Sequence, residues 1–490
     1  MPFAFWILVL PCYAFPQTFD FNKNCQAAYN EIFSLRLQNG KSLIAEERRL
    51  HPDNLIPLLL ESYAEFLHIL TSENQSLLPV FKANKNTRLQ LLKKGDVHSP
   101  WNLHVQAEVQ LHYALAAIQF RDYWSGILDV RKAYFLLAEN VGKFPHFKPS
   151  YKSLLTVNAL LGSVPEKYQW GLRLLGLSGD LKGSLSSLEK LTRDDWEMES
   201  FLRDEVIHVY LSLVLHLAGD KQKAWSTIEK AGYPLPENLF SYYTCIKTAL
   251  YTYHNEEALR LFENLPSGSE YLVLPVLEYY RGLAKLNRLD LRAYGDFNRF
   301  LHINRGQNLI KSAYQKMAWV KLLEGNMGAY AEATRTGKTK GTAQLDADRQ
   351  AQREAENGKP PHPELLKARL LFDGGYFGKA FKTLQNIPHE TLVEKPHRIE
   401  YIYREARILH ESGDTTLAIG KYLMTIQEGK DQPYYFASNA AFNLGLIYEA
   451  KGKSELARKY FSQCMQMNNH EYRYSLTQKA KAGLQRLDKK

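Results

Sequence analysis

Two short stretches contain residue types that bind phosphate or activate water in other proteins. Gly337-Lys338-Thr339 matches the end of a phosphate-binding loop, but that loop needs a glycine five positions earlier, where Glu332 stands. His389-Glu390 could begin a zinc-protease helix, but Val393 occupies the position of the second histidine. The sequence also lacks a G-x-S-x-G nucleophile elbow. We therefore expect no catalytic activity, no cofactor and no metal site.

The cysteines do not predict a disulfide framework either. The chain has four of them, and Cys12 lies in an apolar N-terminal stretch. The other three, Cys25, Cys245 and Cys464, are widely separated, and none has a second cysteine or a histidine at zinc-finger spacing. We expect these three thiols to be free.

The N-terminal stretch is typical of a secretory signal. Met1 to Phe15 is apolar and uncharged, it is short for a membrane span, and Cys12 and Ala14 are small residues suited to cleavage after Ala14. We therefore predict a signal peptide at residues 1–14. The mature protein should be exported, to the periplasm or to the outer membrane, and it should have no transmembrane span.

Composition narrows the class of the mature chain. Its 490 residues are 45% hydrophobic and 23% charged, which is ordinary for a folded protein. The net charge of +10 is spread along the chain, and no nucleic-acid-binding motif accompanies it. We therefore expect no nucleic-acid partner.

The strongest pattern is a repeat of small and large apolar residues near the C-terminus. Small residues fit where two helices cross closely, large ones fill the space beside them, and a glycine permits the turn between the helices. The residues that carry this pattern are Ala441, Leu444, Gly445, Tyr448, Gly452, Ala457, Phe461 and Cys464. Here Cys464 stands at a small, buried position.

This segment resembles a tetratricopeptide (TPR) repeat, a helical hairpin of 34 residues. The same offsets recur at Ala406 to Tyr422 and at Ala368 to Leu384, and less regularly from Phe201 to Ala231 and around Gly282 to Phe300. The resemblance implies an all-α fold, a right-handed superhelical solenoid of helix-turn-helix repeats. A signal-like start followed by divergent repeats is similar to exported TPR proteins of Bacteroidota.

The pattern predicts five segments. After the signal peptide come a helical N-terminal cap at 15–100, a divergent TPR-like solenoid at 101–334, a charged loop with a short helix at 335–362, and C-terminal repeats with a terminal helix at 363–490. The loop is predicted because 335–362 is nearly devoid of large apolar residues and ends in prolines.

The resemblance also implies a binding face. In this family the first helix of each repeat lines the concave side, and its exposed offsets meet a bound peptide. Transferred to the last three repeats, these offsets select His362, Arg369, Phe372, Tyr403, Arg404, Arg407, His410, Asn439, Phe442 and Asn443. The arginines could pair with the carboxylates of an acidic peptide, or they could instead be neutralised by Glu400, Glu405 and Glu411.

These observations favour a scaffold that binds another protein or peptide through its concave face, and we expect this partner to be a component of the cell envelope. Two other functions stay open at this point: a cell-envelope enzyme or its helical accessory module, and a structural subunit that assembles with its own copies. The sequence does not indicate the oligomeric state.

Overall fold

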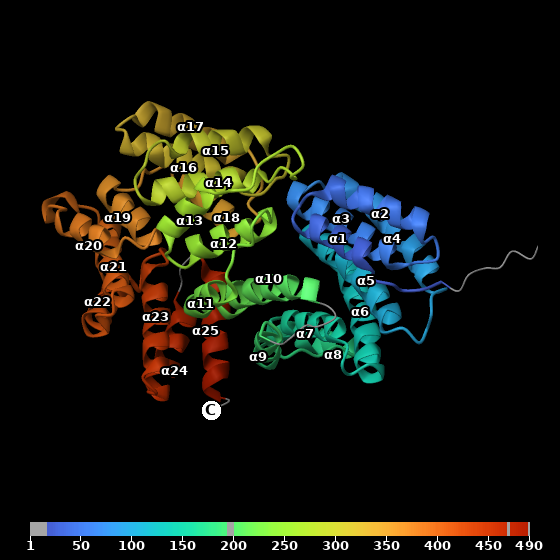
Figure 1. Ribbon diagram of the computed structural model, residues 1–490. Helices are drawn as coiled ribbons and strands as arrows, with labels where there is room; N and C mark the ends of the chain where they lie inside the picture. Colours follow the sequence, from blue (N-terminus) through green and yellow to red (C-terminus); the bar gives the residue numbers. More distant parts are fainter. Residues whose placement is uncertain (1–16, 194–199, 468–470, 489–490) are drawn as a thin grey trace, which may run out of the picture. The chain divides into compact units, whose positions relative to one another are not determined.

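The computed structural model describes residues 17–193, 200–467 and 471–488, and these residues are predominantly α-helical (Figure 1). Within them, the one β-bridge joins Thr18 to Asn54. The predicted all-α class is therefore confirmed. The predicted signal peptide, residues 1–14, lies outside the described residues. No helix in the described ranges is long and apolar enough to cross a membrane.

The chain forms two compact units. Unit 1 comprises the chain up to Gly219 together with Leu235–Ser241 and Pro266–Val273, and unit 2 comprises Asp220–Pro234, Tyr242–Leu265 and the chain from Leu274 onward. The predicted cap at 15–100 is part of unit 1. The predicted solenoid at 101–334 is shared by both units, and the segment 335–362 lies within unit 2.

Unit 1 is built from ten α-helices in its described residues. The long pair α5 and α6 forms a hairpin whose core includes Ala107, Leu111, Ala133 and Leu137, all buried. Small residues on both helices allow this close packing. The helices are α1 (Lys23–Phe33), α2 (Leu37–Leu50), α3 (Ile56–Ser72), α4 (Leu78–Leu92), α5 (Pro100–Gln119), α6 (Tyr123–Lys143), α7 (Lys148–Gly162), α8 (Glu166–Leu174), α9 (Leu181–Leu191) and α10 (Arg203–Leu213).

Unit 2 continues as a series of helical hairpins, with α12 beginning in the last residues assigned to unit 1 (Figure 1). Its helices are α11 (Lys221–Ala231), α12 (Leu239–Tyr251), α13 (Asn255–Glu263), α14 (Pro275–Asn287), α15 (Ala293–Ile303), α16 (Ile310–Leu323), α17 (Met327–Thr339), α18 (Asp346–Asn357), α19 (Pro363–Asp373), α20 (Phe377–Gln385), α21 (Lys395–Glu411), α22 (Thr415–Gly429), α23 (Phe436–Ala450), α24 (Ser454–Gln466) and α25 (Arg473–Asp488).

A recurrent left-handed residue marks the turns between paired helices. Positive φ angles occur at Gly219, Tyr253, Leu289, Gly325, Gly375, Gly413 and Gly452. The residue after such a turn often caps the N-terminus of the next helix. The side chains of Asp220, Asn326 and Asp414 accept hydrogen bonds from the backbone N–H groups of Lys223, Ala329 and Leu417, respectively. The backbone therefore repeats even where the sequence motif does not.

The last hairpin has the close crossing that the sequence predicts. A Cβ atom added to Gly445 of α23 would lie 2.5 Å from Cδ1 of Phe461 on α24. Cys464 is 2% exposed, which confirms its buried position. The repeat register over α23 and α24 is thus confirmed.

The segment 335–362 contains the end of α17 and the whole of α18. Asp348 of α18 is buried, and its carboxylate accepts the backbone N–H groups of Leu309 (2.7 Å) and Ser312 (3.0 Å) at the start of α16. These bonds satisfy donors that a helix N-terminus leaves unpaired. They hold the inserted helix α18 against α16.

Unit 2 is more than a row of hairpins that contact only their neighbours. Helix α19 packs against α14, and the turn before α20 lies against the turn after α12. Tyr376 joins the two turns, because its hydroxyl accepts a hydrogen bond from Asn255 (2.9 Å) and donates one to Glu256 (2.6 Å). Repeats that are far apart in sequence therefore meet within this unit.

Candidate functional site

The structure places all ten predicted binding residues in unit 2. His362 immediately precedes α19, and the others lie on α19, α21 and α23, which pack in sequence against one another. Phe372, Tyr403, Arg404 and Asn443 are buried, whereas His362, Arg369, Arg407, His410, Asn439 and Phe442 are partly exposed. The predicted set is thus brought onto neighbouring helices, but only part of it is accessible to a partner.

Arg404 is neutralised inside the protein. Its Nε atom donates to Glu400 Oε1 at 2.7 Å, and one Nη atom bonds to the same carboxylate. The side chain of Arg404 is only 8% exposed to solvent. This ion pair is the internal pairing that the sequence left as an alternative, and it leaves Arg404 little capacity for a ligand.

Arg369 has a different environment. Its guanidinium lies over the Trp319 ring, 4.9 Å from the centroid, and the closest carboxylate oxygen, on Asp373, is 3.7 Å away. Within the described part of the chain, Arg369 donates no hydrogen bond, although its side chain is 23% exposed. An arginine with five N–H donors and a planar fork can therefore still bind a carboxylate.

Arg407 is partly satisfied. One Nη atom donates to Tyr253 (3.1 Å) and lies 3.3 Å from Glu411, and the other makes a long bond to Tyr403 (3.4 Å). Its Nε is buried and has no hydrogen-bond partner in the described structure. The guanidinium also covers the Phe372 ring at 5.0 Å. The unfilled donor of Arg407 is therefore buried, and a ligand would have to replace the contacts that the Nη atoms make.

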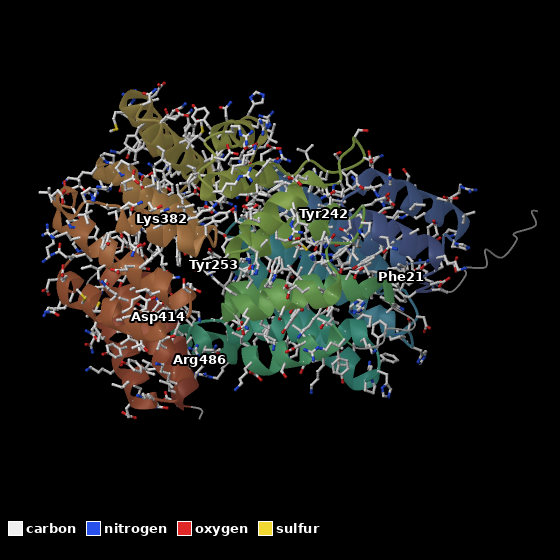
Figure 2. The ribbon with its side chains drawn as sticks, turned by 60° about the vertical axis from the view of Figure 1, so that its left-hand side comes forward. Phe21, Tyr242, Tyr253, Lys382, Asp414 and Arg486 are labelled. Atoms are coloured by element: carbon white, nitrogen blue, oxygen red, sulfur yellow. The ribbon has the colours of Figure 1, made fainter. Side chains whose placement is uncertain are left out.

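Tyr253 was missed by the sequence analysis. It follows α12 with φ of 69°, a conformation usually supplied by glycine, so no repeat hallmark marks it. The ring of Tyr253, which is labelled in Figure 2, packs on Phe372 and Phe377. Its hydroxyl accepts a hydrogen bond from Arg407 and donates one to Glu411, both on α21. Tyr253 therefore competes with any ligand for Arg407.

Three of the remaining predicted residues, Tyr403, Asn439 and Asn443, contact one another. Asn439 accepts hydrogen bonds from the Tyr403 hydroxyl (2.9 Å) and from Asn443 (2.6 Å). His410 lies 3.2 Å from the Tyr422 hydroxyl, and burial lowers its pKa. These hydrogen bonds fix the side chains that surround Arg369 and Arg407.

A second cluster, also missed by the sequence, adjoins Arg369. Trp319 of α16 donates to Glu354 of α18 at 2.6 Å, and Lys316 Nζ lies 3.8 Å from the centre of the Trp319 ring. Burial and the nearby Arg369 charge together lower the pKa of Lys316 from 10.5 to about 7. Two basic side chains thus share one indole ring, and an additional anion would favour the charged form of Lys316.

Arg369 and Arg407 keep 23% and 20% of their side-chain exposure, so water reaches both side chains.

Unit 1 contains a buried ionic network of a different kind. Lys152 lies 2.7 Å from Glu205 and 3.6 Å from Glu108, and the hydroxyls of Tyr29 and Tyr63 donate to Glu205. All five residues are at most 9% exposed. This network lacks access for a substrate, so it serves to connect α1, α3, α5, α7 and α10.

A surface hollow of about 560 Å³ lies between α2, α3 and α4 in unit 1. Its carboxylates are neutralised, because Glu61 pairs with Arg48 (2.8 Å) and Glu65 pairs with Arg88 (2.8 Å). A glycan-cleaving pair needs carboxyl groups that can exchange protons with substrate. The hollow therefore offers no support for the enzyme alternative. In the described ranges, no group of three or more metal-ligating side chains is gathered.

Comparison with known proteins gives limited information. The sequence matches no family profile and no curated protein. Among solved structures, it is similar to the TPR domain of P58(IPK), with 11% identity over 88% of this chain and 97% of that one and a TM-score of 0.22. It is also similar to yeast Tom70, with 13% identity over 88% and 96% of the two chains and a TM-score of 0.24. Because both TM-scores are low, the TPR-like assignment rests on the chain's own hairpins.

Proposed function

We propose that this protein is a non-catalytic scaffold and that unit 2 binds an extended, carboxylate-bearing segment of another protein. The segment would lie along the helices α16, α19, α21 and α23. The observation that carries this proposal is Arg369, which is solvent-accessible and held over Trp319, yet donates no hydrogen bond in the described part of the chain. Arg407 on the next first helix adds a partly exposed guanidinium whose contact with Tyr253 a ligand can replace.

The energetic argument follows from these unfilled donors. A charge-assisted hydrogen bond contributes about 1.5–3 kcal/mol, and a bidentate arginine–carboxylate pair supplies two. Arg369 can form such a pair without first breaking a hydrogen bond. Arg407 must exchange its contact with Tyr253, so its net contribution is smaller.

The charge pattern requires a specific ligand. Arg369, Arg407 and Lys316 supply the positive charge, but Glu354, Asp373 and Glu411 lie among them and cancel part of the general field. A ligand must therefore place its carboxylates at the arginines and keep its other side chains neutral. Discrimination then depends on position rather than on total charge.

The proposed partner belongs to the cell envelope. The apolar, uncharged Met1–Phe15 followed by a folded helical chain supports export to the periplasm or the outer membrane. Cysteines that are widely spaced and buried are compatible with that environment without disulfide bonds.

The test is affinity capture of the tagged protein from the host's envelope fraction, followed by mass spectrometry. Once a partner is identified, the double variant Arg369→Ala/Arg407→Ala should weaken its binding at least about tenfold, because each lost charge-assisted pair contributes more than about 1.4 kcal/mol. The matched control is Lys379→Ala/Lys382→Ala, which removes the same charge from exposed positions on α20 of the same unit. Equal losses from both pairs would indicate nonspecific attraction and would overturn the proposal.

A further inference from the structure

Exposed large apolar side chains concentrate on two helices of unit 1. Within the described ranges, seven of the eighteen such residues lie on α6 and α8, three of the other eleven lie on α22, and the rest are scattered over the chain. Soluble proteins seldom gather exposed apolar side chains in this way without a function. The seven are Tyr123, Trp124, Leu128, Phe135, Tyr168, Trp170 and Leu174.

On α6 these residues form one stripe. Trp124, Leu128, Arg131 and Phe135 follow the spacing of a single helix face and span about 16 Å at 1.5 Å per residue. Trp124 is 70% exposed. The opposite face of α6 is buried through Ala133 and Leu137, so the stripe is the outward face of a firmly packed helix.

On α8, Trp170 and Leu174 are one turn apart and are 61% and 77% exposed. The end of α8 adjoins the stripe on α6, because Arg131 Nε donates to the Leu175 carbonyl at 2.7 Å. Phe135 also approaches Gly176: a Cβ atom there would lie 3.2 Å from the Phe135 ring. The exposed residues of both helices therefore belong to one patch, which we name the α6/α8 patch.

The charge within the α6/α8 patch is positive. Its cations are Arg131, Lys132 and Arg173, all exposed. Over the whole of α6 and α8, five basic residues stand against three carboxylates, those of Asp129, Glu139 and Glu166. Asp129 is buried and ion-paired with Lys85 and Lys132, so it does not offset the surface charge of the arginines.

We propose that the α6/α8 patch is a peripheral membrane-binding surface that engages anionic lipid headgroups. Tryptophan and tyrosine prefer the headgroup level of a bilayer, leucine and phenylalanine insert below it, and arginine and lysine attract anionic lipids. Tryptophan, tyrosine and arginine also occur at protein hot spots, so the vesicle experiment must separate lipid binding from protein docking. The most exposed residue of the patch is Leu174, a side chain that inserts into bilayers and is under-represented at protein hot spots.

The experiment is sedimentation of the full chain with extruded vesicles of phosphatidylcholine alone or mixed with phosphatidylglycerol in equal parts. We expect binding to the mixed vesicles and little to the neutral ones. The variant Trp124→Ser/Trp170→Ser/Leu174→Ser should lower the partition constant at least about tenfold, which is about 1.4 kcal/mol and less than the transfer free energy of one fully buried apolar side chain. Arg173→Gln should weaken binding only to the mixed vesicles.

The control variant, Val80→Ser/Val393→Ser/Leu417→Ser, changes three side chains that are 60%, 76% and 56% exposed elsewhere in the chain. It keeps the same N-terminal apolar segment, so membrane binding through that segment is equal in both variants. Unchanged binding of the patch variant, or an equal loss in the control, would overturn the proposal. Loss of a captured protein partner from the patch variant without any vesicle binding would overturn it in favour of protein docking.

Discussion

Acid should destabilise unit 1 through three buried histidines. His104, His112 and His208 are each 3–5% exposed, and burial lowers the pKa of each from 6.5 to about 3. Their rings pack against aromatic neighbours, as His208 does against Phe33 and Phe240. The unfolded chain therefore binds more protons than the folded chain between about pH 3 and 6.5.

The sign and magnitude follow from this difference. Because the folded-state pKa is depressed, stability is complete above pH 6.5 and is lost as the pH falls toward 3. At about pH 5.5 the three histidines together lower the free energy of unfolding by about 4 kcal/mol relative to neutral pH. That is a large part of the stability of an ordinary domain.

The assay is urea unfolding at two pH values, one near neutral and one at about pH 5.5, which is one unit below the pKa of an unperturbed histidine. Unfolding is followed by hydrogen exchange and mass spectrometry on peptides of α5 and α10. His208→Phe retains an aromatic ring between Phe33 and Phe240 but removes one titrating group. The variant should lose about 3 kcal/mol of its free energy of unfolding between neutral pH and about pH 5.5, instead of about 4 kcal/mol. Equal stability of the wild type at both pH values would refute the reasoning, as would an unchanged pH response in the variant.

Three further predictions concern the repeat register, the binding face and export. Gly445→Leu should destabilise the C-terminal hairpin by about 1–3 kcal/mol or more, because its side chain would overlap Phe461, and unchanged thermal melting would contradict the assigned packing. Tyr253→Phe removes the hydroxyl that accepts from Arg407 and should strengthen partner binding in a pull-down; weaker binding in a folded variant would show that Tyr253 contacts the ligand. The mature protein from its native host should begin close to Phe15, and N-terminal sequencing that finds intact Met1 would remove the export proposal.

The sequence predicted the fold best where repeats keep their small residues. Gly445 and Cys464 lie where the TPR-like pattern requires, because a helix crossing tolerates few alternatives at those positions. Divergent repeats were harder to recognise, since Tyr253 and Leu289 adopt the left-handed turn that the pattern assigns to glycine. The division into two units near Gly219 has no compositional signal.

The sequence predicted which residues of the candidate site share a helix, but not which contacts they make with other helices. Helical offsets correctly placed Arg369, Arg404 and Arg407 on neighbouring first helices, but they could not distinguish the buried pair Arg404–Glu400 from the accessible Arg369. That distinction depends on tertiary packing. The contacts of Tyr253 with α21 depend on it too, because they join residues 154 positions apart.

The central claim is that a partner lies along the first helices of the repeats in unit 2. Site-specific photo-crosslinking in the native host tests it directly, with p-benzoylphenylalanine in place of Phe442, which is partly exposed on α23. The comparison position is Leu417, which is 56% exposed on α22, the second helix of its repeat. We expect a cross-linked envelope protein from position 442 and none from position 417. The same adduct from Leu417 alone would place the partner on the other face of the repeats and would overturn the proposal.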